Sequence, residues 1–171
     1  MDSFVEQLVK KKKSPAQIAA MVVTVVVALL LVAGCVLFMA ILGIFAVLAI
    51  AAIAYGAWYL LTAQNIEYEY CVTNGDIDID RIVAQRKRKR IVSVAGRKIE
   101  SAGRYLPEKW AGRSVDRTVI AAPSAEEEGL YYFSYHSKKR GHTLVVFQPN
   151  DRVKDAVYES LPKLIQLDWN K

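Results

Sequence analysis

Residues 18–61 read IAAMVVTVVVALLLVAGCVLFMAILGIFAVLAIAAIAYGAWYLL, and no charged residue occurs in residues 14–66. A membrane-spanning helix needs about 20 apolar residues, because the hydrocarbon core is about 30 Å thick and a helix rises about 1.5 Å per residue. The apolar stretch is about twice that long. We therefore predict two transmembrane helices, over residues 16–38 and 41–62, joined by a turn within residues 39–43.

Four consecutive lysines directly precede the first predicted helix: Lys10, Lys11, Lys12 and Lys13. Positively charged residues resist translocation, so the N-terminus should remain cytoplasmic. Two spans then return the chain to the same side, which makes the protein an integral cell membrane protein with cytoplasmic N- and C-termini. The predicted parts are a basic cytoplasmic tail over residues 1–15, a transmembrane hairpin over 16–62 and a soluble domain over 65–171.

Two other interpretations of the apolar stretch fit it less well. A cleaved signal peptide has an apolar region of about 7–15 residues, which is much shorter. Val32-Ala33-Gly34-Cys35 resembles a lipoprotein lipobox, in which Cys35 would be lipidated, but apolar residues follow it instead of the usual polar tether. Cys35 and Cys71 are the only cysteines, a number that fits a reducing compartment.

The soluble segment begins with a predicted β-hairpin. Residues 66–72 and 76–80 alternate between apolar and polar side chains, the period of a half-buried strand. Asn74-Gly75 between them is a strong hairpin signal, because both residues tolerate positive φ. Five further strands are predicted over residues 91–94, 98–102, 118–122, 130–136 and 143–147, with a long loop over 103–117.

A helix is predicted after the last strand. Asn150 can cap its first turn, and Pro162 should end it near Leu161. Four apolar residues recur at helical spacing and predict one buried face: Val153, Val157, Leu161 and Leu164.

Seven strands closed by one C-terminal helix resemble the pleckstrin-homology (PH) superfold over residues 66–166. Two spans followed by Tyr68-x-Tyr70-x-x-Thr73-Asn74-Gly75-x-Ile77-x-Ile79-Asp80-Arg81-Ile82 also resemble an uncharacterised family of short bacterial membrane proteins with PH-like soluble halves. We therefore expect an α+β membrane protein: an N-terminal transmembrane α-helical hairpin, then a PH-like seven-stranded antiparallel β-barrel or sandwich with a C-terminal α-helix.

The strongest candidate binding residues form a basic run before the third predicted strand: Arg86, Lys87, Arg88, Lys89 and Arg90. The PH resemblance implies that positive charge gathers near this loop. Near an anionic leaflet each Lys or Arg contributes about 1 kcal/mol, so this run and Lys10–Lys13 are predicted to bind anionic lipid, with Lys138, Lys139 and Arg140 as a further basic turn. The run could also be only a solvated turn. Nucleic acid is disfavoured, since no aromatic residues interleave it.

The sequence contains no catalytic motif, and we expect no catalytic residue, no metal site and no cofactor. His136 and His142 flank one turn and are interpreted as ordinary strand residues. Asp76, Asp78 and Asp80 could ligate calcium, form the acidic outer face of a strand, or pair with the basic run across the sheet. Trp110 could fold back onto the barrel or dip towards the membrane.

These features favour a membrane-anchored, non-enzymatic binding or scaffold module that engages anionic lipid or a partner protein. The alternative is a subunit of a larger membrane complex or a homo-oligomer that uses the barrel as a docking surface.

Overall fold

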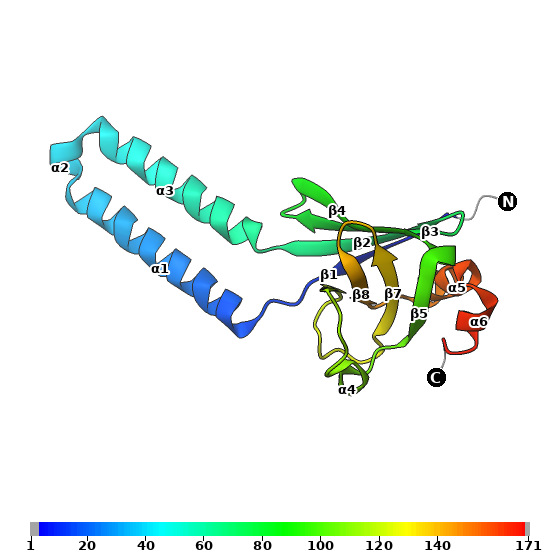
Figure 1. Cartoon of the computed structure of the whole chain (residues 1–171). Helices are drawn as coiled ribbons and strands as arrows, with labels where there is room; N and C mark the ends of the chain where they lie inside the picture. Colours follow the sequence, from blue (N-terminus) through cyan, green and yellow to red (C-terminus); the bar gives the residue numbers. More distant parts are fainter. Residues whose placement is uncertain (1–3, 170–171) are drawn as a thin grey trace. The chain divides into compact units, whose positions relative to one another are not determined.

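The computed structural model describes residues 4–169, which divide into two compact units. One unit is a helical hairpin over residues 13–65, and the other is a β-sandwich formed by residues 4–12 together with 66–169. The elements in chain order are β1 (Phe4–Lys10), α1 (Pro15–Leu37), α2 (Met39–Leu42), α3 (Ile44–Ala63), β2 (Ile66–Thr73), β3 (Asp76–Val83), β4 (Lys87–Ala95), η1 (Gly96–Lys98), β5 (Ile99–Arg104), α4 (Pro107–Trp110), β6 (Arg117–Ala121), β7 (Tyr131–Ser137), β8 (Gly141–Phe147), α5 (Asp151–Ser160) and α6 (Lys163–Gln166) (Figure 1).

The helical hairpin has the two helices predicted from the apolar stretch. A capping box starts α1: the Gln17 amide donates to Ser14 Oγ at 3.2 Å, and the Ser14 amide donates to Gln17 Oε1 at 3.0 Å. The short helix α2 occupies the predicted turn, and Gly43 precedes α3 with a φ of 54°, a conformation that favours glycine. By length and composition, α1 and α3 are both capable of crossing a membrane.

Sheet A has the order β1-β2-β3-β4, and all its pairs are antiparallel. Its first strand corrects the predicted domain boundaries, because residues 4–10 belong to the sandwich and are not a free basic tail. β1 pairs with β2 from Phe4 opposite Thr73 to Lys10 opposite Glu67. The helical hairpin is therefore inserted between two neighbouring strands of one sheet.

Two tight turns join β2 to β3 and β3 to β4, and the sequence indicates only the first of them clearly. Asn74 and Gly75 have φ values of 50° and 85°, which confirms the predicted β2–β3 hairpin. Ala84 and Gln85 also have positive φ values, 54° and 56°, although neither is typical of such a turn. This second turn is tight, so β4 begins at Lys87 and the basic run lies mostly within the strand.

Sheet B has the order β5-β7-β8-β6, which corrects the prediction of seven antiparallel strands. With β1 the described chain has eight strands, and β6 runs parallel to β8. Residues 105–116 cause this arrangement. They carry the chain, through α4, from β5 at one edge of sheet B to β6 at the other.

The two sheets pack face to face around the main core, and no backbone ladder joins them within residues 4–169. The domain is thus an open sandwich, not a closed barrel. Tyr70 links the sheets through its buried hydroxyl, which donates to the Ala121 carbonyl and accepts from the Gln148 amide at 3.3 Å. Burial raises the pKa of this hydroxyl and keeps it protonated.

The C-terminal helix α5 covers one part of the core. Asn150 Oδ1 accepts from the Val153 amide at 2.9 Å, which confirms the predicted cap. Three of the four predicted apolar residues are buried, but Leu164 is 80% exposed, because the chain turns at Pro162 and α6 takes a new direction.

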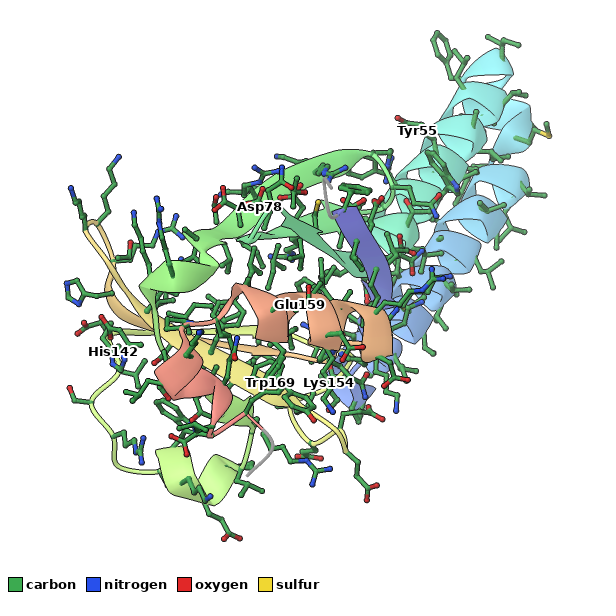
Figure 2. All side chains as sticks on the ribbon, turned by 90° about the vertical axis from the view of Figure 1, so that its right-hand side faces the viewer. Tyr55, Asp78, His142, Lys154, Glu159 and Trp169 are labelled. Atoms are coloured by element: carbon green, nitrogen blue, oxygen red, sulfur yellow. The ribbon has the colours of Figure 1, made fainter. Side chains whose placement is uncertain are left out.

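Trp169 also belongs to the core, although no local pattern in the sequence indicates this. Its side chain is 1% exposed, and its ring centroid lies 4.9 Å from that of Tyr131. Lys154 of α5 places its Nζ atom 5.1 Å from the centroid of the same Tyr131 ring, and Figure 2 shows Lys154 and Trp169 close together.

Candidate functional site

The register of sheet A brings the two predicted basic segments to one end of the sheet. Lys10 lies opposite Glu67, Glu67 opposite Ile82, and Ile82 opposite Arg88. The β3–β4 turn follows Val83, and the chain continues from Lys10 towards α1 at the same end. Basic residues more than seventy positions apart in the sequence therefore share one end of the domain. We call this region, residues 10–12 and 86–89, the basic end.

Two arginines of the basic run are held by carboxylates on the outer face of sheet A. Asp80 receives two hydrogen bonds, from Arg88 Nε at 2.6 Å and from Arg90 Nε at 3.0 Å. Arg88 also contacts Glu69, and Arg90 Nη1 lies 2.9 Å from Asp78 Oδ2. Of the three interpretations of the aspartates, the structure thus supports pairing with the basic run across the sheet (Figure 2, where Asp78 is labelled).

Asp80 is the centre of this network, and its residue is only 4% exposed. Burial alone would raise the pKa of its carboxyl group, but hydrogen bonds from Arg90 and Arg88, together with their charges, outweigh burial and hold the pKa below its ordinary value. Asp80 therefore stays ionised and holds both guanidinium groups by hydrogen bonds.

Glu69 has a different environment on the same face. A hydrogen bond with the Glu6 carboxyl group is the largest influence and raises the pKa of Glu69; burial raises it further, and the charge of Arg88 opposes both. Glu6 belongs to β1 and Glu69 to β2, so this interaction links the N-terminal strand to the rest of the sheet.

Lys87 and Lys89 alternate with these arginines and therefore project from the opposite face of β4. Both residues are exposed, and neither forms a salt bridge in residues 4–169. They also lie on an edge strand, where lysines discourage pairing with another chain. Arg86 lies in the turn itself and is exposed.

The N-terminal lysines have several environments. Lys10 Nζ lies 3.9 Å from Glu67 Oε1, and Lys12 Nζ lies 2.8 Å from Glu127 Oε2. The Lys11 amide donates to the Ile66 carbonyl at 2.9 Å, while the Lys11 side chain is exposed. Lys13 belongs to the helical unit.

The histidines and Trp110 are also placed by the structure. His136 and His142 lie opposite each other on β7 and β8, and no group of three or more possible metal ligands occurs among the residues described. Trp110 folds back onto the sandwich, with its ring centroid 4.8 Å from that of Tyr132.

A model of the family described as bacterial PH-like domain (DUF6106) matches residues 1–166, which include β1, the helical hairpin and the sandwich together. No match was found among curated proteins or among solved structures. The family match confirms the resemblance to an uncharacterised bacterial family with PH-like domains. The chain therefore belongs to the DUF6106 family of bacterial PH-like domains.

Proposed function

We propose that this chain is a membrane-anchored, non-enzymatic binding module whose PH-like domain contacts anionic lipid headgroups at the cytoplasmic face of the cell membrane. The supporting observation is the register of sheet A, which gathers the basic end where the chain leaves β1 for α1.

The two chain connections between the sandwich and the helical hairpin are short. Residues 11–14 join β1 to α1, and residues 64–65 join α3 to β2. Four extended residues reach at most about 14 Å. An anionic leaflet attracts each nearby Lys or Arg by about 1 kcal/mol, and this attraction decays over a Debye length of about 8–10 Å. With such a short tether, the domain needs little affinity of its own for lipid to contact the headgroups.

The pairing of β1 with β2 supports the proposed topology. These strands flank the helical hairpin and bond to each other, which favours a topology with both ends of the hairpin on the same side of the membrane. The lysines before α1 favour the cytoplasmic side.

Within the basic run, alternate residues differ in their ion pairs. Arg88 and Arg90 pair with carboxylates, namely Asp80, Glu69 and Asp78, and hold β3 and β4 together. Lys87 and Lys89 have no carboxylate partner in the described chain and are the proposed lipid contacts, with Lys11 and Arg86 beside them.

The test uses the full chain in nanodiscs of phosphatidylcholine alone or with added phosphatidylglycerol. Hydrogen exchange of the β3–β4 turn should be slower in the anionic discs, and added salt should remove the difference. The double variant Lys87→Gln/Lys89→Gln should lose it. The matched control Lys98→Gln/Lys163→Gln removes the same charge at exposed positions outside the basic end and should keep it.

Equal exchange in both kinds of disc would reject lipid contact and leave the lysines as protection of an edge strand. If the turn is protected equally in neutral and anionic discs, and the chain also forms stable oligomers in mild detergent, the docking alternative is favoured instead.

A further inference from the structure

A second basic feature lies on sheet B. It includes Arg117, the last residue of the loop that the sequence predicted over residues 103–117. Arg117 is the first residue of β6, and its Nη1 atom is buried without a hydrogen-bond partner among the residues described. None of the ion pairs in that part of the chain involves Arg117. Leaving a buried guanidinium nitrogen unpaired is costly, so the position calls for an acceptor.

The register places a tyrosine in the same row. Arg117 lies opposite Thr143 of β8, and Thr143 lies opposite Tyr135 of β7. Thr143 is fully buried and Tyr135 is 8% exposed, so this row faces the interior of the sandwich. No hydrogen bond of the Tyr135 hydroxyl is present within residues 4–169.

The β7–β8 turn adds a second guanidinium. Arg140 precedes β8, and its amide donates to the Ser137 carbonyl at 3.3 Å. Gly141 lies opposite Ser137, so Arg140 stands three positions before Thr143, the residue opposite Tyr135. Burial raises the pKa of Tyr135, and the charges of Arg117 and Arg140 oppose this effect. Asp116, which precedes Arg117, lies beside the same turn, where its Oδ2 atom accepts from the His142 amide at 2.7 Å.

We propose that Arg117, Arg140 and the Tyr135 hydroxyl form a binding site for a phosphate-type oxyanion, which is separate from the basic end of sheet A. Guanidinium groups bind tetrahedral oxyanions through paired N–H donors, and a tyrosine hydroxyl supplies one further donor. The anion supplies the acceptor that Arg117 Nη1 lacks. The ligand is either free phosphate or the phosphate of a lipid headgroup, and these sources share the same chemistry at the site.

The experiment uses the full chain in two arms, with hydrogen exchange of the β7–β8 turn as the readout. In one arm inorganic phosphate is added to phosphatidylcholine nanodiscs, with chloride at equal ionic strength as the reference. In the other arm phosphatidic acid is included in the nanodiscs. Slower exchange in the first arm identifies free phosphate as the source, and slower exchange only in the second arm identifies the headgroup.

Arg117→Gln should weaken the response about tenfold or more, since removing one charge-assisted hydrogen bond weakens binding by a factor of that order. Arg117→Lys should recover part of it, because the charge remains but the paired donors do not. Arg97→Gln is the matched control at an exposed position in η1 and should respond like the unmodified chain. If Arg117→Gln does not fold, Arg140→Gln in the exposed turn decides the question.

No response in either arm, or an undiminished response of both arginine variants, would overturn the proposed site. Because the readout and the variants differ from those of the β3–β4 turn, failure here leaves the proposed lipid contact of sheet A intact, and the converse also holds.

Discussion

Replacing residues 13–65, which hold the two apolar helices, with a linker of about four Gly and Ser residues should leave a folded, water-soluble domain, whereas residues 66–171 alone should not fold stably. The reason is that β1 is an integral strand of sheet A. Lys11 already bonds to Ile66, with its amide 2.9 Å from the Ile66 carbonyl oxygen, so a short turn can connect the two strands.

The contribution of β1 follows from its contacts. Val9 is buried in the core, and burial of a valine side chain contributes about 1.5–3 kcal/mol. Gln7 donates to the Gln148 carbonyl at 3.1 Å and accepts from the Asn150 amide at 2.7 Å, and each such bond contributes about 1 kcal/mol. Without β1 the fragment should lose roughly 3.5–5 kcal/mol from these contacts, much of the stability of a small domain.

The assay is urea unfolding followed by circular dichroism, with size-exclusion chromatography to detect aggregation. In the linked domain, Val9→Asn should be clearly destabilising, because Val9 faces the core. The matched control Leu8→Asn should change stability little, since Leu8 is 51% exposed on the outer face. A fragment of residues 66–171 as stable as the linked domain would refute the assignment of β1 to the sandwich, and so would a linked domain in which both variants behave alike.

Three further predictions concern the full chain in mild detergent, measured by thermal unfolding. Asp80→Asn should destabilise the domain by roughly 1–3 kcal/mol at neutral pH. Because the folded-state pKa of Asp80 is lowered, the stabilisation by its carboxylate is present above about pH 4 and is lost as the pH falls through the folded pKa. The stabilities of the variant and the unmodified chain should therefore converge in acid. Gly96→Ala should cost about 1–3 kcal/mol, because its Cβ atom would lie 2.5 Å from the Ser160 carbonyl oxygen; Gly34→Ala, which meets nothing within 4 Å, is the control. Asn150→Ala should cost about 1 kcal/mol through loss of the α5 cap, and Asn150→Gly should cost less; equal effects would argue against capping.

Local patterns were sufficient for the elements with short-range causes. The apolar stretch predicted α1 and α3, because its length and lack of charge are local properties of the sequence and a helix satisfies the backbone polar groups of such a stretch internally. Asn74-Gly75 predicted the β2–β3 turn, since the required positive φ is a property of those two residues. Asn150 predicted the start of α5 for a comparable reason.

Other features depend on partners that are distant in the sequence. β1 finds its partner beyond the whole helical hairpin, and its residues Phe4–Lys10 lack strict alternation. The parallel pairing of β6 with β8 depends on the route of residues 105–116 across sheet B, and the burial of Trp169 depends on the path of the chain after α5. Local propensity does not encode these choices.

Some properties of the candidate site can likewise be predicted from the sequence, whereas others depend on the folded structure. Composition and short-range periodicity are enough to establish two apolar helices, a β-rich basic domain and two clusters of positive charge. The availability of those charges is a property of the folded sheet: Asp80 holds Arg88 and Arg90, while Lys87 and Lys89 have no carboxylate partner among the residues described. That distinction arises because cross-strand register, which exists only once the sheet has assembled, determines which opposite charges come within hydrogen-bonding distance.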